Sequence, residues 1–300
     1  MSTKRNLQLP PPTNSAGGTA IGQQFTIDLP LGYRYHEIAL CYVDGTGAPT
    51  DILALISDFI IYRNGIPQRT HTAAELDHLN GLNGSQYQRQ QIGAGANMRQ
   101  TQTLFLAEPW RKSKTDTDAM AWSADAANGF RTFQIKGTFL VAMPAGAAFF
   151  VSARVDAPLA PPKGGAALKK VYRQQIPASG ASNDVVTLDE RDGYQTICMK
   201  QPATSNILNV TLKNNDVTII DTLNSFDNIS QLTGMGLNPA TGTAASAFGF
   251  DLVLDADDPI LSALPATSTG AGLWLHLAYT PGTAATGNVV ALIERFGPLD

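Results

Sequence analysis

The chain has 300 residues, about twice the usual length of one domain, so we expect two domains with a core each. Charged residues make up only 15% of the chain, against roughly 25% in ordinary soluble domains, and the formal net charge is -4. Direct binding of nucleic acid is not expected, because it requires a concentrated basic face. A surface this poor in charge suggests that partners cover much of it.

The N-terminal twenty residues are polar and rich in proline, with no apolar stretch of the secretory type, so we expect synthesis in the cytoplasm. Lys4 and Arg5 precede a run of three prolines. Such a segment is typical of a disordered tail. The alternative is a basic arm on an anionic surface such as lipid headgroups, where each basic residue contributes about 1 kcal/mol. Lys4 and Arg5 are therefore a candidate membrane-facing arm, effective only through many copies.

Short apolar or alternating segments separated by Gly, Pro and Asn turns follow, and they predict β-strands. In the first half they lie at 24–29, 35–43, 53–63, 101–107, 132–143 and 148–155. Thr72 and Glu75 have the spacing of a capping box, which predicts a short helix that ends near Gly81.

Three prolines and two adjacent glycines interrupt the pattern at 158–167, which predicts a linker. The expected domains are therefore 1–157 and 168–300. In the second half, strands are predicted at 185–189, 196–199, 207–213, 217–220, 247–254, 273–279 and 289–296. A second short helix is predicted at 222–232, where Leu223, Phe226 and Ile229 recur at a spacing of three.

The two halves repeat each other. Segment 25–33 returns as 186–194, with an apolar-Thr-aliphatic-Asp start and a Gly-Tyr end in both. The predicted hairpin start at 60–65 returns as 210–215, and the predicted strand at 149–155 resembles 273–279. The sequence thus predicts one all-β sandwich present twice, with one short helix in a loop of each copy.

Catalytic chemistry is not indicated. His36, His71, His78 and His276 are not spaced like zinc ligands, and no nucleophile or phosphate-binding motif is present. Asp255, Asp257 and Asp258 follow Asp251 and are weak candidates for a structural calcium ion, although a solvated turn explains them more simply. No catalytic residue and no cofactor is therefore expected. Cys41 and Cys198 are expected to be two buried thiols, since a disulfide between separate domains requires a close approach.

One segment carries a family resemblance. Leu29-Pro30-Leu31-Gly32, with Ile27 before it and Tyr35, Ile38, Leu40 and Tyr42 after it, resembles the N-terminal signature of corticovirus-type double jelly-roll major capsid proteins. These proteins come from tailless bacteriophages with an internal membrane, in the lineage of tectivirus coat proteins and adenovirus hexon. The hairpin at Asn64-Gly65 and the segments 106–109, 186–199, 273–279 and 289–296 are also similar. The loops at 239–246 and 265–272 depart from the family, so its loop contacts and cation sites are not transferred.

The resemblance implies two tandem eight-stranded jelly rolls and a structural function. Three chains would form a six-lobed, pseudo-hexameric homotrimer that tiles an icosahedral shell over a lipid membrane. The implied location is the virion capsid. The implied partners are further copies of the chain, neighbouring capsomers, the vertex (penton) protein, and the internal membrane or its proteins, without direct contact to nucleic acid.

The main alternative is a tandem β-sandwich module that binds carbohydrate or a receptor, because sandwiches host unrelated functions. Such a module is expected to expose aromatic side chains together on one loop edge. Trp110, Trp122 and Trp274 instead occupy separate segments, and Trp274 alternates like a strand core residue.

Overall fold

The computed structural model divides the chain into two compact units, residues 1–169 with 298–300, and residues 170–297. It describes residues 4–14, 18–45, 50–95, 98–111, 114–160, 167–188, 193–214, 217–239, 248–254, 264–265 and 273–298. Most of the expected linker, residues 161–166, lies outside these ranges.

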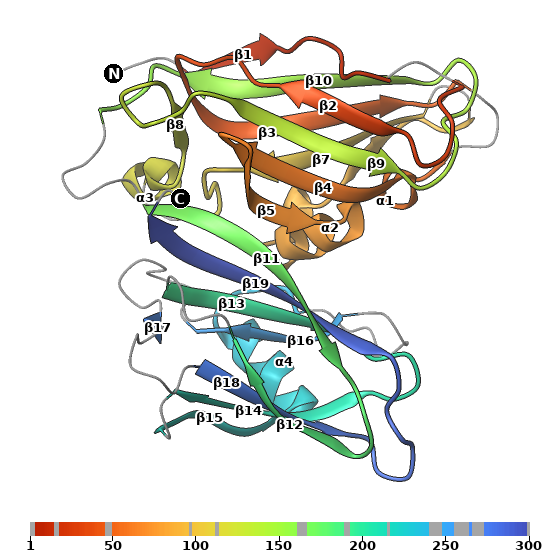
Figure 1. Ribbon diagram of the computed structural model, residues 1–300, viewed down its shortest axis with the longest axis vertical. Helices are drawn as coiled ribbons and strands as arrows, with labels where there is room; N and C mark the ends of the chain where they lie inside the picture. The colour runs from red at the N-terminus through yellow and green to blue at the C-terminus, as the bar shows by residue number, and fades with distance from the viewer. Residues whose placement is uncertain are drawn as a thin grey trace. The chain divides into compact units, whose positions relative to one another are not determined.

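Eight strands in two sheets build the first unit (Figure 1). One sheet has the order β1-β10-β3-β7 and the other the order β2-β9-β4-β5. Their bounds are β1 (Arg5–Gln8), β2 (Gln24–Asp28), β3 (Tyr33–Val43), β4 (Ile56–Arg63), β5 (Ile66–His71), β7 (Arg99–Phe105), β9 (Phe133–Phe139) and β10 (Ala148–Asp156). Two short strands extend the first sheet, since β6 (Gln90–Ile92) pairs with β7 and β8 (Trp122–Ala124) pairs with β3.

The second unit is built in the same way. Its sheets have the orders β11-β19-β13-β16 and β12-β18-β14-β15. The bounds are β11 (Ala167–Pro177), β12 (Ser182–Thr187), β13 (Gly193–Lys200), β14 (Ile207–Asn214), β15 (Val217–Asn224), β16 (Phe248–Val253), β18 (Leu273–Tyr279) and β19 (Asn288–Pro298). The short β17 (Leu264–Pro265) pairs with β13.

The eight main strands of each unit are connected identically. Without the short extra strands, one sheet in each unit joins the first, eighth, third and sixth strand, and the other joins the second, seventh, fourth and fifth. The prediction of two eight-stranded jelly rolls is confirmed. The repeated segments 25–33 and 186–194 both begin in the second strand, and the repeated hairpin joins the fourth and fifth.

One proposed correspondence is wrong. The segment 149–155 belongs to β10, the eighth strand, whereas 273–279 is β18, the seventh strand of its unit. The true counterpart of β10 is β19. Both β18 and β19 bury aliphatic side chains, so apolar content alone did not distinguish them.

The two predicted helices are present, each between the fifth and sixth strand. In α2 (Ala73–Leu82) the capping box is complete, because Thr72 Oγ1 accepts from Glu75 N at 3.1 Å and Thr72 N donates to Glu75 Oε2 at 2.8 Å. The second helix, α4 (Ser225–Gly234), begins later than expected because Asn224 is its N-cap.

The first unit contains more helix than predicted. The segment 53–63, expected as one strand, is divided into α1 (Ile52–Leu55) and β4, and Asp51 caps α1. The 3-10 helix η1 (Ser85–Tyr87) and the helix α3 (Lys114–Ala119) lie in the longer loops. In the described part of the chain, no helix is long and apolar enough to span a membrane.

The signature segment packs into the first core. The hydroxyl of Tyr35 donates to the carbonyl of Pro30 at 2.6 Å, and Gly32 between them has a φ of 89°, which favours glycine. Tyr35 is fully buried against Phe133 at 5.3 Å between ring centroids. This core is rich in aromatic rings, whereas the second core is mostly aliphatic and centres on Leu212, Leu275 and Leu277.

Candidate assembly surfaces

The N-terminal residues that were candidates for a membrane-facing arm belong to the first sheet. β1 pairs with β10 from Arg5 to Gln8, so the interpretation as a disordered tail is wrong for these residues. The Lys4 ammonium donates to Asp118 Oδ1 of α3 at 2.6 Å, and the guanidinium of Arg5 lies 5.3 Å from the ring centroid of Tyr33. Lys4 therefore has a neutralising partner, while the exposed Arg5 retains a charge near solvent. Contact with a membrane stays a prediction.

A buried histidine lies behind this arm. His36 Nδ1 is 3.3 Å from Asp118 Oδ1, and His36 Nε2 is 3.2 Å from Asp156 Oδ1 at the end of β10. Burial lowers the pKa of His36 and outweighs the opposite effect of the two carboxylates. Arg34 also donates to the backbone carbonyl of Asp118. The cluster fixes α3 against the ends of β3 and β10.

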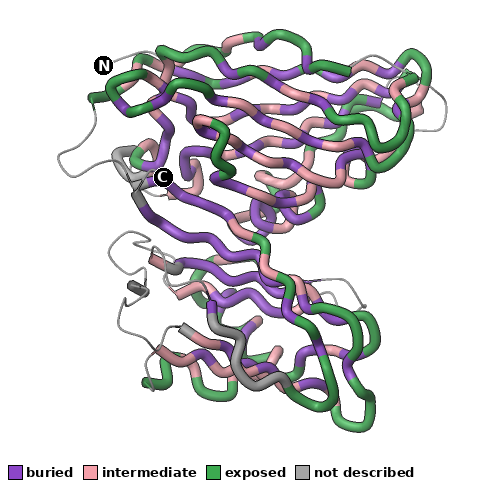
Figure 2. The backbone as a smooth tube through the Cα atoms, in the orientation of Figure 1, coloured by how far each residue is buried: buried purple, intermediate pink, exposed green. Residues whose placement is uncertain are grey.

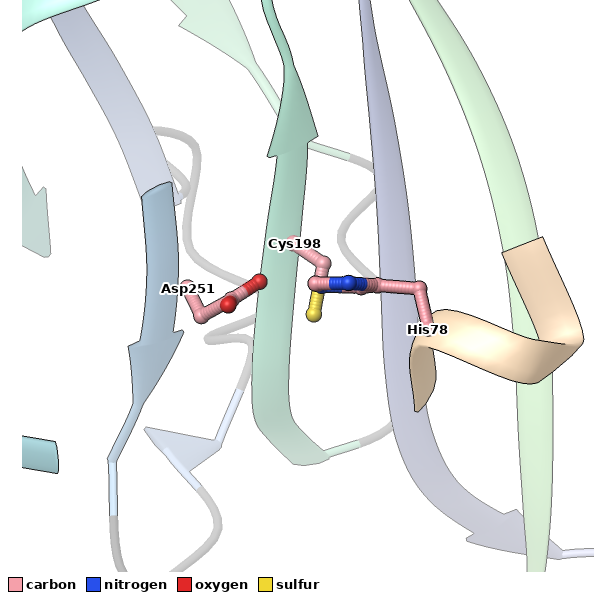
Figure 3. Close-up of side chains that lie close together, drawn as sticks. All are labelled: His78, Cys198 and Asp251. Atoms are coloured by element: carbon pink, nitrogen blue, oxygen red, sulfur yellow. The ribbon is translucent and has the colours of Figure 1, made fainter. Parts of the chain in front are cut away.

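The candidate calcium ligands Asp255, Asp257 and Asp258 lie outside the described residues, so the cation site stays a prediction. Asp251 is described and is buried on β16, where its register partner on β13 is Cys198. Figure 3 shows these two side chains on neighbouring strands; it also labels His78, which belongs to α2 of the first unit.

The two cysteines occupy equivalent positions. Cys41 lies on β3, the third strand, opposite Phe150 of β10 and Thr101 of β7. Cys198 lies on the third strand of its own unit and has Leu292 of β19 as its eighth-strand partner. Neither cysteine is in a disulfide bond. Cys198 is buried as expected, but Cys41, which was also expected to be buried, is only half-buried.

This difference extends to the residues beside each cysteine on the central strands. In the first unit, Ile38, Leu40 and Tyr42 of β3 point into the core, and the alternate residues Ala39 and Cys41 are half-buried on the outer face. In the second unit, residues 195–199 of β13 and 291–297 of β19 are buried without alternation (Figure 2). The outer face is therefore partly open around Cys41 and closed around Cys198.

We define the Cys41 face by the outward residues at the centre of the first sheet. They are small or neutral and follow the register of β10, β3 and β7, and they comprise Phe150, Cys41 and Thr101 in one row and Ser152, Ala39 and Thr103 in the next. Phe150 is 46% exposed, and the others are half-buried. Charged side chains lie around this centre, for example Arg99 and the pair Arg154–Glu37, with 3.8 Å between Nη1 and Oε1.

The second unit has its own open surface, the α4 edge, formed by β15 and α4. β15 is the last strand of its sheet, and Val217 and Ile219 on it are 63% and 39% exposed. On α4, Phe226 is 82% exposed and only Asn228 and Leu232 are buried. The equivalent helix α2 buries most of its residues, including Leu76, Leu79 and Leu82.

Sequence reasoning recorded Phe226 only as a helix signal and missed its exposure. No local pattern marked this exposure, because Leu223 belongs to β15 and residues three apart, such as Phe226 and Ile229, lie near the same face of a helix.

The tryptophans occupy three different environments. Trp110 contacts the rings of Tyr87 and Phe105 at centroid distances of 5.5 and 5.8 Å, and Trp122 is fully buried. The expectation that Trp274 is a core residue is wrong, because Leu275 and Leu277 on the same strand point inward. Trp274 is half-buried on the opposite face, with the Lys213 ammonium 4.7 Å from its ring centroid.

Comparison with known proteins identifies the fold. No family model and no curated protein matches the chain. Among solved structures, the major capsid protein of bacteriophage PM2 is similar over 99% of this chain and 98% of its own, with 17% identity and a TM-score of 0.76. The major capsid protein of Sulfolobus turreted icosahedral virus covers 98% and 97%, with 14% identity and a TM-score of 0.62. The Faustovirus major capsid protein covers 99% and 90%, with 7% identity and a TM-score of 0.58. The double jelly-roll fold is thereby established.

Proposed function

We propose that this chain is a structural major capsid protein. In this proposal, three copies form a pseudo-hexameric trimer, and such trimers tile an icosahedral shell over an internal lipid membrane. The observation that carries it is the presence of one eight-stranded topology twice in a chain whose whole length has the fold of viral major capsid proteins.

Duplication has a mechanical purpose in such a particle. Two jelly rolls in each of three chains give six similar lobes, and a six-lobed block packs in a hexagonal lattice although its symmetry is only threefold. Contacts between lobes and between neighbouring blocks also explain why only 15% of residues are charged, since interface cores are depleted of charge. The function needs no catalytic residue and no cofactor.

The mass of the purified protein in solution tests this proposal. We expect light scattering to give about three times the chain mass of 31.9 kDa. A stable monomer that binds glycans would contradict the capsid proposal and support a carbohydrate- or receptor-binding module.

Membrane contact is a finer part of the same proposal. Because Lys4 is neutralised by Asp118, the exposed Arg5 supplies most of the attraction of the arm for anionic headgroups. Flotation of the protein with anionic and with zwitterionic vesicles measures it. We expect Arg5→Gln to weaken binding to anionic vesicles, while Arg131→Gln, at another exposed arginine of the first unit, leaves it unchanged. If both variants bind anionic vesicles equally well, the N-terminal residues do not form a membrane-binding arm.

A further inference from the structure

Each jelly roll carries the same two comparable surfaces, because both have the same strand order. One is the outer face around the third strand, and the other is the edge formed by the fifth strand and the helix that follows it. In the first unit the helix α2 is buried and the Cys41 face is partly open. In the second unit the face around Cys198 is buried and the α4 edge is open. The chain therefore leaves one surface of each kind uncovered.

We propose that the α4 edge of one copy docks on the Cys41 face of a second copy of this chain. The proposal rests on the proposed trimer and assigns its contact surfaces. The occupant is a second copy because the chain itself carries both uncovered surfaces. Each contact between two copies then covers one surface of each kind.

The side chains of the two surfaces are complementary in size. The α4 edge presents large apolar groups, above all Phe226 at 82% exposure, with Val217 and Ile219 on the adjoining strand. The Cys41 face presents short side chains such as Ala39 and Thr103, on which a large ring can lie flat, beside the half-exposed ring of Phe150. An aromatic pair in such a contact stabilises it beyond the apolar area that it buries.

The charges are complementary as well. Segment 217–239 contains Asp221 and Asp227 and no lysine or arginine. The outward positions of the receiving sheet carry three basic residues, Arg34, Arg99 and Arg154, against two acidic ones, Glu37 and Asp156. Arg5 is not among them, because its register partner is the core residue Val155. An acidic edge approaching a sheet with a basic excess favours this pairing over contact between two identical surfaces.

The two surfaces differ, so the contact is heterologous. Each copy offers its α4 edge to one neighbour and its Cys41 face to the other. Such a contact closes when the rotation between copies divides a full turn, and three copies then use all six surfaces. No surface of either kind remains open in the closed ring.

Thiol cross-linking tests the proposed contact directly. Cys198 is fully buried, so Cys41 is the natural thiol available to a reagent. We expect Phe226→Cys treated with a short bismaleimide to give covalent dimers and trimers on a denaturing gel. The same variant with Cys41→Ser should give none. Ile21→Cys, at a 63% exposed site of the first unit outside both surfaces, is the matched control and should also give none.

Loss of the contact is the second measurement. We expect Phe226→Asp to raise the concentration at which trimers dissociate about tenfold or more, while Ile21→Asp has no effect. Because Phe226 and Ile21 are both exposed in the single chain, both variants should keep the circular dichroism spectrum of the parent. A parent protein that is monomeric overturns the proposed function. A parent trimer that neither cross-links through Cys41 nor weakens with Phe226→Asp overturns only this inference.

Discussion

Asn228 on α4 binds the backbone of Asp251 on β16 through both ends of its amide. Nδ2 donates to the Asp251 carbonyl at 2.8 Å, and Oδ1 accepts from the Asp251 N–H at 3.2 Å, with both residues buried. In the first unit, Asn80 Nδ2 on α2 donates to the carbonyl of Thr103 on β7 at 2.8 Å. Both helices are thus fixed to the sixth strand by an asparagine, which leaves Phe226 on the solvent side of α4.

Asn228→Ala should destabilise the protein. The change removes two hydrogen bonds and leaves buried backbone groups of Asp251 without this partner, which costs about 1 to 3 kcal/mol. Urea unfolding measures the loss. Ser230→Ala, at an exposed position of the same helix, is the control and should change the free energy of unfolding by less than about 0.5 kcal/mol. Equal effects of the two changes would show that the asparagine does not hold the helix.

Thr72→Ala should weaken α2 at its N-terminus. It removes the hydroxyl that accepts from Glu75 N, and loss of such a cap typically costs about 1 kcal/mol. Thr72→Ser keeps the hydroxyl and should retain most of the stability. Thermal unfolding of the two variants separates the effect of the cap from other effects of the site. If Thr72→Ser lowers the unfolding midpoint as much as Thr72→Ala, the hydroxyl of Thr72 does not cap the helix.

The stability should fall on mild acidification because of buried histidines. Burial, assisted by Arg69, lowers the pKa of His71 to about 3, and burial also lowers the pKa of His36. The folded state therefore binds these protons less readily than the unfolded state. The contribution of His71 is complete above its unfolded pKa of 6.5 and decreases by about 1.4 kcal/mol per pH unit as the pH falls toward 3.

His71→Phe tests this pH dependence. The substitution preserves a ring against Phe59, which stacks on His71 at a centroid distance of 5.6 Å, and removes the titration. We expect the variant to lose less stability than the parent between pH 6.5 and pH 5, measured by urea unfolding at each pH, with His36 still titrating. Parallel curves for parent and variant would contradict the role of His71.

Glu108→Gln should be severely destabilising. Burial alone would raise the pKa of Glu108, but Lys169 and Arg111 outweigh it and lower this pKa. Lys169 Nζ lies 2.7 Å from Oε1 and Arg111 Nε lies 3.0 Å from Oε2, with all three side chains buried. Removing the shared carboxylate charge from a buried cluster costs about 3 to 5 kcal/mol.

The contribution of Glu108 to the free energy of unfolding should decrease in acid. The stabilisation by Glu108 is present above its unfolded pKa of 4.5 and is lost as the pH falls through its lowered folded value. Urea unfolding at pH 7 and below pH 4.5 should therefore show a smaller difference between Glu108→Gln and the parent in acid. Glu37→Gln, which breaks the partly exposed pair with Arg154, is the control and should cost at most about 1 kcal/mol.

Sequence patterns predicted the duplicated sandwich but missed the first strand of each jelly roll. β1 reads Arg-Asn-Leu-Gln and is mostly exposed, and β11 contains Lys169, Lys170 and Arg173, so neither shows the alternation that marks a half-buried strand. Both were recognisable only from the strands beside them. The fifth strand of the first unit, β5, was missed for a similar reason, since its buried residues include Arg69 and His71.

The proposed assembly surfaces were less predictable than the fold. The equivalence of Cys41 and Cys198 follows from their places near the start of each half, and the sequence does contain that information. Their different burial is a property of the folded chain, which no local pattern records. The outward direction of Phe226 depends likewise on how Asn228 fixes α4 to β16.

The strand β6 and the helices η1 and α3 have no counterpart among the described residues of the second unit. In a particle of three chains, they would therefore mark every second lobe and leave the lobes between unmarked. A foreign peptide inserted beside the 73% exposed Ile92 would occur three times per block, once for each chain. The duplicated chain would thus offer threefold labelling on a sixfold tile, which six identical single-domain subunits cannot do.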